Sequence, residues 1–582
     1  MQAKIVAMYI ERVLNRNSAP TLLLRESYRK NGKVCKRTLA NLSQWSPESI
    51  QQLEASLKGG QGFQALETSF EIVRSRPHGH VLAVLGTLKG IQLDKAIAQR
   101  RSDHRQFVLT MIVARILESA SKLSTARQLN PDTCTSTLAA ELSLPSVHKD
   151  SLYRALDWLL KRQVKIEQTL ASRHLQSGSI VLLDLTSTYL EGETCELAKR
   201  GYSRDRKKGG VQITFSLLCN AQGCPVAVEV FEGNTTDPTT LSHHLQKLTE
   251  RFNLTTGIIV GDRGTLPDCR IASELKPLSG WLWVTALKAA QIQALFETGD
   301  LHGESFQTTD WVELSTPNYP GERLIACRNP QLASHRHHRR QALLSATETA
   351  LDKVIKATQR AHKPLQGQDN IGLRVGKVIN RFKMAKHFQL TITETAFRYQ
   401  RDDPAIQTEA RLDGIDVIRT SVPATTLAAP EVVKTYKSLA QVESAFRCLK
   451  AFDLNIRPIF HRLEERVRAH VFLCFLAYYV EWHMRVSLAP ILFAEDDPEQ
   501  AQALRTSVVQ PAQRSESAKQ KAGRRQTLSG LPVHSFRSLL ADLATITKNT
   551  IQPTEEEAHS FDKITLPTPT QQQAFELLNV TL

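Results

Sequence analysis

Three acidic residues, Asp184, Asp262 and Glu443, occupy positions where a metal-dependent phosphoryl-transfer site could be assembled. Asp184 interrupts an apolar stretch and is followed by hydroxyl side chains. Asp262 ends a second apolar stretch and is followed by Arg263 and Gly264. Glu443 lies in a segment without Gly or Pro. Carboxylate oxygens are the ligands that Mg²⁺ and Mn²⁺ prefer. If the fold brings these acids together, they can bind such ions.

The segment from Tyr436 to Lys450 is expected to be helical, because its apolar residues recur every three or four positions. Glu443 and Lys450 share the face that apolar neighbours such as Phe446 would bury. A buried carboxylate needs a partner, since an unpaired buried charge is costly. A bound cation would be such a partner. A salt bridge to Lys450 or Arg447 on a structural helix is the alternative that this segment alone leaves open.

The elements that would position these acids follow a recognisable order. Three segments are strand-like: 179–188, 211–220 and 225–231. Asp237 is expected to be the N-cap of a helix that runs to about Phe252. A short apolar strand, 257–262, then presents Asp262 at its end. The order β-β-β-α-β matches the core of ribonuclease-H-like nucleotidyl transferases, so we expect an α/β protein with that core.

The quoted motifs resemble a known family. Asp184-Leu-Thr-Ser-Thr, Gly261-Asp262-Arg-Gly264 and the Tyr436, Glu443, Lys450 set are similar to motifs of the DDE transposases of bacterial insertion sequences. The closest resemblance is to the group with a Y-x2-R-x3-E-x6-K signature and a β-rich insertion before the third acid. Leu439 stands in place of the signature arginine, which removes one expected phosphate or end-DNA contact. Arg447 and Arg457 are the candidates to replace it.

The resemblance implies an enzyme that cleaves DNA at the ends of an insertion sequence and transfers the strand to target DNA. Asp184, Asp262 and Glu443 would be its catalytic residues and would bind two Mg²⁺ or Mn²⁺ ions, with Asp184 contacting both. Two such ions, about 3.5–4 Å apart, serve in-line phosphoryl transfer. Tyr436 and Lys450 would position phosphate. The expected partners are double-stranded DNA, as terminal inverted repeats and target, and a second copy of the chain in a homodimer on paired ends.

Two other functions remain open at this point. A structure-specific nuclease would cut DNA without strand transfer. A noncatalytic DNA-binding protein of the same fold would have lost the chemistry, although three intact acids argue against it.

The charge of the chain favours DNA as a partner. It carries 74 Lys and Arg against 58 Asp and Glu, a formal net charge of +16, and neutralising phosphates releases counterions. A basic segment, 199–208, is expected to form a loop near Asp184, although a solvated hairpin tip is the alternative. The candidate DNA contacts are Tyr436, Lys450, Arg447, Arg200, Arg204, Arg206, Lys207 and Lys208. A second basic cluster, His335–Arg340, is a poor metal site and suits phosphate contact or solvation.

The distance from Asp262 to Glu443 along the chain is far longer than one crossover needs, so an inserted domain is expected. We predict six regions. They are a β-hairpin and helix region with possible DNA contact (1–60), a mainly helical DNA-binding or dimerisation region (61–175), the first part of the core (176–270), a mostly β insertion with a basic helical stretch at 331–364 (271–425), the C-terminal core helices (426–495), and a basic flexible linker and tail (496–582).

Nine cysteines show no CxxC pair or zinc-ligand spacing, which favours a reduced, intracellular protein. The longest apolar stretch, 471–480, is too short to span a bilayer, and the first ten residues lack a long apolar core. These features predict an intracellular protein, and the resemblance to bacterial transposases implies a cytoplasmic bacterial protein associated with the nucleoid.

Overall fold

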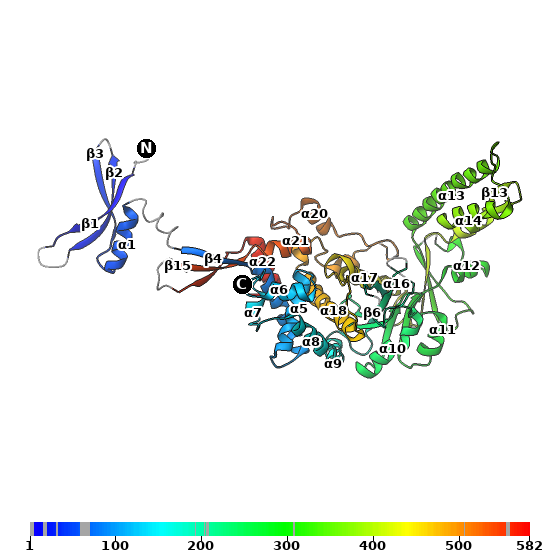
Figure 1. Ribbon diagram of the computed structural model, residues 1–582, viewed down its shortest axis with the longest axis horizontal. Coiled ribbons are helices and arrows are strands. Elements are labelled where there is room, and N and C mark those ends of the chain that lie inside the picture. Colours follow the sequence, from blue (N-terminus) through cyan, green and yellow to red (C-terminus); the bar gives the residue numbers. More distant parts are fainter. Residues whose placement is uncertain are drawn as a thin grey trace. The chain divides into compact units, whose positions relative to one another are not determined.

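The computed structural model describes residues 5–582 except 16–19, 31–32, 59–69, 193, 203, 205–208, 307–308, 506 and 554–558. The chain divides into two compact units (Figure 1): Met1–His78 with Ala544–Pro567, and Gly79–Leu543 with Thr568–Leu582. The C-terminal segment therefore contributes to both units.

The first unit contains two antiparallel three-stranded sheets. One sheet consists of β1 (Ile5–Val13), β2 (Thr21–Lys30) and β3 (Lys33–Asn41), and the other of β4 (Phe70–Pro77), β15 (Thr547–Pro553) and β16 (Phe561–Ile564). Helix α1 (Pro47–Leu57) begins after Ser46, whose side chain accepts a hydrogen bond from the Ser49 amide. The expected N-terminal strands and helix are thus confirmed, while the turn between β2 and β3 lies outside the described residues.

An eight-stranded mixed sheet forms the centre of the second unit, in the order β10-β11-β14-β9-β8-β5-β6-β7. Its strands are β5 (Ile180–Tyr189), β6 (Gln212–Asn220), β7 (Pro225–Glu232), β8 (Gly257–Gly261), β9 (Trp281–Ala286), β10 (Trp311–Leu314), β11 (Arg323–Arg328) and β14 (Ile415–Thr420). β5, β6 and β7 are antiparallel, β8 pairs parallel with β5, and β9 pairs parallel with β8. The four strands predicted around the acids are confirmed as β5 to β8.

Helices pack around this sheet. Those that precede β5 are α3 (Gly79–Gly90), α4 (Leu93–Ile97), α5 (Asp103–Leu117), α6 (Lys122–Leu129), α7 (Leu138–Glu141), α8 (Lys149–Leu160) and α9 (Gln163–His174). Helix α18 (Glu464–Ser487) contacts α3, α5, α8 and β7. Every residue from 471 to 480 in it is buried, so the longest apolar stretch forms a core helix. None of the helices in the described part of the chain is long and apolar enough to cross a membrane.

The stretch between β7 and β8 is helical, as expected, but its beginning differs from the prediction. It contains a 3₁₀ turn (Asp237–Thr240), α10 (Leu241–Gln246) and a π-helical turn (Lys247–Arg251). The N-cap is Thr236, and Asp237 is already inside the first turn. The assignment of Asp237 as a cap was therefore wrong, because its carboxylate pairs with the Arg204 guanidinium instead.

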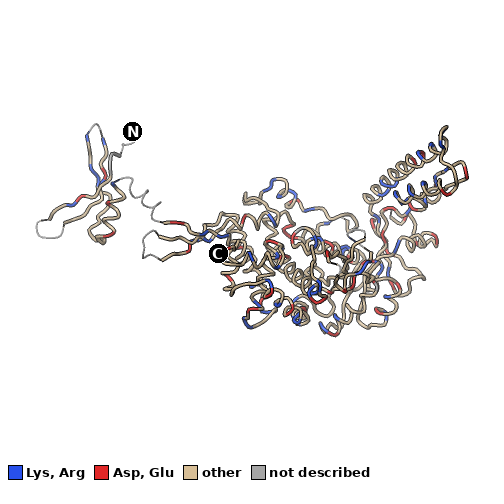
Figure 2. The backbone as a smooth tube through the Cα atoms, viewed as in Figure 1, with Lys and Arg blue, Asp and Glu red and all other residues tan. Residues whose placement is uncertain are grey.

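Region 271–425 is more helical than the expected mostly β insertion. Besides strands it holds α12 (Ala289–Glu297), α13 (Pro330–Thr358), α14 (Gln368–Phe382), α15 (Asp403–Arg411) and the hairpin β12 (Phe388–Ile392) and β13 (Phe397–Arg401). α13 and α14 lie side by side (Figure 1) and share a core that includes Leu344, Leu351, Ile371 and Val375. The apolar residues recur at helical spacing on both segments, so burial of these faces favours a helical pair. Lys and Arg residues occur along both helices (Figure 2).

Helices and strands occupy much of the described part of the chain after residue 496, so the expectation of a flexible tail was wrong. It contains α19 (Pro498–Ala503), α20 (Glu516–Arg524), α21 (Phe536–Leu543) and α22 (Pro569–Leu578), besides β15 and β16. The basic stretch expected to be a linker forms α20, which Ser515 caps by accepting from the Ala518 amide. Leu539, Leu543 and Phe575 are buried, and this apolar area stabilises α21 and α22 in the second unit.

Candidate active site

Adjacent parallel strands place Asp184 and Asp262 beside each other. In the β5–β8 pair Leu183 lies opposite Gly261. Asp184 and Asp262 each come one residue later, at the same level of the two strands. Side chains alternate between the faces of a sheet, so equivalent positions on paired strands point to the same face. The apolar strand residues before each acid thus fix the position of its carboxylate.

Helix α17 (Leu439–Arg447) brings the third acid to the same place. It packs against β5, and its Phe446 ring meets Phe215 of β6 edge to face, with 5.5 Å between ring centroids. Glu443 lies one helical turn before Phe446 and faces a cavity of about 450 Å³. The cavity is lined by Asp184, Leu185, Thr186, Arg204, Asp262, Glu443, Phe446, Arg447, Lys450, Ala451 and Arg457.

The predicted single helix from Tyr436 to Lys450 is divided into three parts. Helix α16 (Ala429–Lys437) ends where the Ser438 hydroxyl donates to the Thr435 carbonyl at 2.6 Å, α17 follows, and a π-helical turn (Cys448–Phe452) carries Lys450. The buried side of α17 contains Leu439, Val442 and Phe446, whereas Glu443 is exposed where it lines the cavity. The expectation that Glu443 lies on a buried face was therefore wrong.

Backbone amides orient the two strand acids. Asp262 Oδ1 accepts from the Gly264 amide at 3.0 Å and from the Thr265 amide at 2.7 Å. Asp184 Oδ1 accepts from the Leu185 amide at 2.8 Å. A Cβ atom at residue 264 would lie 3.3 Å from Asp262 Oδ1 and 3.3 Å from Asp237 Oδ2, so glycine leaves room for both carboxylates to approach. Asp237 is thus a fourth acid beside the site, which its expected role as a helix cap had concealed.

The acids influence each other electrostatically. Burial, together with the charges of Asp262 and Glu443, raises the pKa of Asp184 to about 7, although the Leu185 amide and Arg204 act in the opposite direction. Burial also raises the pKa of the Tyr436 phenol, and the charge of Asp262 adds to this shift. Like charges that raise the pKa of a neighbouring carboxyl group favour a cation between them. The three acids do not place one carboxylate oxygen each within 4.8 Å of one another.

Cationic side chains surround the acids. Lys450 Nζ donates to Thr186 Oγ1 at 2.6 Å and to the Ser187 carbonyl at 2.5 Å, which fixes the π-helical turn to β5. The Arg204 amide donates to Ser187 Oγ at 3.0 Å. Arg457 lies over the Tyr189 ring, 4.8 Å from its centroid. The cavity therefore combines carboxylates with basic groups that can contact phosphate.

The structure separates the predicted DNA contacts into three sets. Arg204, Arg447 and Lys450 line the cavity, as does Arg457. Tyr436 does not line it but lies within electrostatic reach of Asp262, and Arg200 is exposed outside the lining. The remaining three, Arg206, Lys207 and Lys208, lie outside the described residues.

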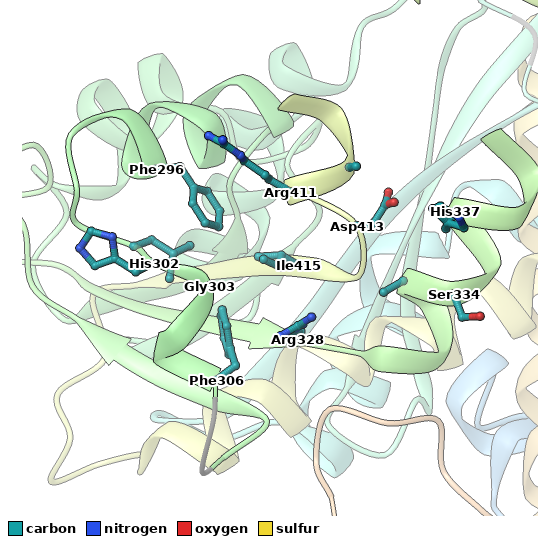
Figure 3. A pocket seen from close by; sticks show the side chains of 13 residues that line it. Phe296, His302, Gly303, Phe306, Arg328, Ser334, His337, Arg411, Asp413 and Ile415 are labelled. Atoms are coloured by element: carbon teal, nitrogen blue, oxygen red, sulfur yellow. The ribbon is translucent and has the colours of Figure 1, made fainter. Parts of the chain in front are cut away.

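A second cavity, of about 640 Å³, lies in the region of α13 and α15 (Figure 3). Its lining includes Arg328, His337 and Arg411, and the one acid among its lining residues is Asp413. Arg340 Nη1 donates to Asp413 Oδ1 at 3.1 Å, so that carboxylate is already neutralised. The lining of this cavity has no set of acids for hard cations.

Comparisons with known proteins identify the family to which the chain belongs. Residues 175–480 match the family described as transposase DDE domain, and residues 10–67 match the IS1634 family transposase N-terminal domain. The chain is thus a DDE-type transposase, a polynucleotidyl transferase. The first match spans more than half of the chain and includes all three acids, and the chain belongs to the DDE transposases of bacterial insertion sequences.

No curated protein matches the chain. Among solved structures, one similar chain comes from the cryo-EM structure of a piggyBac transposase synaptic complex with hairpin DNA. The two share 9% sequence identity over 78% of this chain and 91% of that chain, with a TM-score of 0.24. A likeness at that level supports no further conclusion about the site.

Proposed function

We propose that this transposase cleaves the DNA ends of an insertion sequence and transfers the released strand to target DNA in a metal-dependent reaction. One observation carries the proposal. Asp184, Asp262 and Glu443 come from two strands and a helix that are distant in sequence, and all three line one cavity. Arg204, Arg447, Lys450 and Arg457 line the same cavity, so groups that bind cations and groups that bind phosphate lie together.

The sheet supports a ribonuclease-H-like core. In the order β7-β6-β5-β8-β9, three antiparallel strands are followed by two parallel ones. We assign residues 176–270 and 426–495 to this core and 271–425 to an insertion. β9 and its partners β14, β11 and β10 continue the core sheet beyond residue 270, so the insertion begins within the sheet. We assign residues 1–60 and 61–175 to end-DNA contact or to dimerisation.

The acids fit divalent cations. Burial and like charges hold the pKa of Asp184 at about 7, a condition that a cation relieves. Asp184, Asp262 and Glu443 would hold two Mg²⁺ or Mn²⁺ ions, which when bound supply charge stabilisation and an activated nucleophile.

The remaining groups would hold DNA. Lys450 is fixed next to β5 by Thr186, so its ammonium group would contact a phosphate near the scissile bond. Leu439, at the position of the signature arginine, is buried and cannot make that contact. Arg447 and Arg457 line the cavity and would contribute phosphate contacts in its place. The partners would be terminal inverted repeats and target DNA, bound by a homodimer.

Cation binding is expected to depend on pH. The pKa of Asp184 is raised from 3.8 to about 7, so below that pH a cation must displace a proton. The apparent affinity for Mn²⁺ should therefore fall as the pH is lowered from about 8 to about 6, approaching about tenfold per unit. Calorimetric titration in buffers of different protonation enthalpy would measure both the affinity and the released proton. Equal affinity across this range would contradict the role of Asp184.

A strand-transfer assay tests the function directly. The wild-type protein, an end fragment already cut to expose its 3′-hydroxyl, and supercoiled target DNA should yield joined products in Mg²⁺. A fragment ending in a dideoxynucleotide is the control and should not be joined. Nicking of an uncut end without any joining would identify a structure-specific nuclease, and binding without either reaction would identify a noncatalytic DNA-binding protein.

A further inference from the structure

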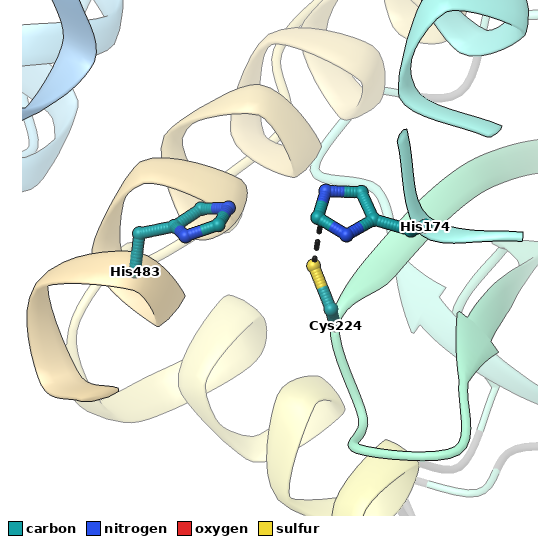
Figure 4. Close-up of side chains that lie close together, drawn as sticks. All are labelled: His174, Cys224 and His483. Carbon is teal, nitrogen blue, oxygen red and sulfur yellow. Dashed lines mark hydrogen bonds between the residues drawn. The ribbon is translucent and has the colours of Figure 1, made fainter. Parts of the chain in front are cut away.

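Three side chains with metal-binding atoms converge at a place that is separate from the acidic cavity (Figure 4). His174 is the last residue of α9, Cys224 directly precedes β7, and His483 lies on α18. Their ligand atoms all lie within 4.8 Å of one another, and Cys224 Sγ is 3.8 Å from His174 Nε2. None of the three lines the cavity that holds Asp184.

We propose that His174, Cys224 and His483 bind a Zn²⁺ ion. Zinc–nitrogen bonds of about 2.0–2.1 Å and zinc–sulfur bonds of about 2.3 Å place tetrahedral ligands roughly 3.5 Å apart. The observed sulfur–nitrogen distance of 3.8 Å is close to this value. Two imidazoles and one thiolate are a donor set that suits zinc, whereas Mg²⁺ prefers oxygen ligands. A water molecule would complete the four ligands.

The state of His483 supports a ligand at this point. Its Nε2 atom is buried and has no hydrogen-bond partner among the described residues, and buried polar atoms are rarely left so. Burial, with the nearby His174 and Arg173, lowers the pKa of His483 to about 4. Burial likewise lowers the pKa of His174. Both rings are therefore neutral at physiological pH, which is the form that binds metals.

A metal-free cluster explains less of the geometry. The Tyr479 hydroxyl lies 2.8 Å from His174 Nε2, and burial raises the pKa of the Cys224 thiol, so a hydrogen-bonded network accounts for His174 and Cys224. It leaves Nε2 of His483 without a partner. A Zn²⁺ ion would replace the proton of the Cys224 thiol and bind all three side chains.

The site would connect elements that are far apart in the chain. α9 lies before the sheet, the β6–β7 turn belongs to its antiparallel side, and α18 follows the insertion. Metal binding to preformed ligands stabilises the folded state over the unfolded one. The ion would thus fix the antiparallel strands against two helices. This role does not depend on the chemistry proposed for the acids.

Cobalt substitution tests the proposal on the intact full-length protein. Co²⁺ added to metal-depleted wild-type protein should give a sulfur-to-cobalt charge-transfer band in the near ultraviolet, together with visible bands of tetrahedral Co²⁺. The acidic cavity contains no cysteine, so carboxylate-bound Co²⁺ cannot produce the charge-transfer band. Absence of this band at saturating Co²⁺ in the folded wild-type protein would overturn the proposal.

Variants locate the ligands. C224S should lose the charge-transfer band, and H483Q should weaken Zn²⁺ binding by at least tenfold, as measured by competition with a chelating dye. C474S is the matched control, because Cys474 is also buried next to a histidine, with Sγ 3.9 Å from His470 Nε2. C474S should keep the band. A band that persists in C224S would contradict the assignment, and circular dichroism would verify that each variant is folded.

Discussion

D184N, D262N and E443Q should each reduce Mg²⁺-dependent cleavage of element-end DNA by on the order of a thousandfold or more. An amide has nearly the shape of the carboxylate but lacks the negative charge that binds a divalent cation. Binding of end DNA, measured by fluorescence anisotropy, should change little. The loss should appear in the rate of nicking at saturating DNA.

A stability measurement separates a loss of chemistry from a loss of folding. The pKa of Asp184 is raised to about 7 by burial and by its acidic neighbours. The free energy of unfolding therefore decreases as the pH rises from the unfolded pKa of this carboxyl group through its folded pKa. Without divalent ions, D184N should be at least as stable as the wild type above about pH 7.

E465Q, at an exposed acid on α18, is the control for the cleavage assay. Wild-type cleavage by any of the three acid variants would contradict the assignment.

K247M should destabilise the second unit by about 3–5 kcal/mol. The Lys247 side chain is 1% exposed, and its Nζ lies 2.9 Å from Glu167 Oε2 and 2.7 Å from Glu229 Oε2. Glu167 also accepts from the Val228 amide at 3.1 Å. Methionine would fill a similar volume but leave the Glu167 carboxylate without its cation, whereas Glu229 would keep Arg468 at 3.9 Å. A buried uncompensated charge is costly. The midpoint of urea denaturation would measure the change.

The matched control for this prediction is an exposed ion pair. Lys519 Nζ lies 2.7 Å from Glu516 Oε1, and the two side chains are 47% and 78% exposed. K519M should change the free energy of unfolding by about 0–1 kcal/mol, because water screens such pairs. If K247M is no more destabilising than K519M, the buried ion pair does not hold α9, β7 and the π-helical turn together.

Local patterns in the sequence suffice to predict the strands that carry the acids. The apolar run before Asp184 and the shorter one before Asp262 are typical of buried strands, and both are strands of the central sheet. The register that places Leu183 opposite Gly261 depends on pairing between distant segments. No local pattern predicts that register, so the prediction that the two acids lie near each other required the assumption of a known core. Their catalytic role stays a prediction.

Tertiary packing accounts for what the sequence did not reveal. The segment around Ser438 has no Gly or Pro, yet the backbone between α16 and α17 is interrupted there, because each helix packs separately. Glu443 is exposed, contrary to the buried stripe predicted for it, because the part of α17 that carries it borders the cavity. The His174, Cys224 and His483 cluster was likewise missed, because zinc spacing rules detect neighbouring ligands and these come from three separate elements.

The most direct test of the account is to determine where Mn²⁺ binds in crystals of the protein with end DNA, using anomalous scattering. The account predicts anomalous density in the cavity between β5, β8 and α17, within coordination distance of the Asp184, Asp262 and Glu443 carboxylates. Mn²⁺ bound to the DNA-engaged protein only elsewhere, with these three carboxylates free of metal, would contradict the central claim.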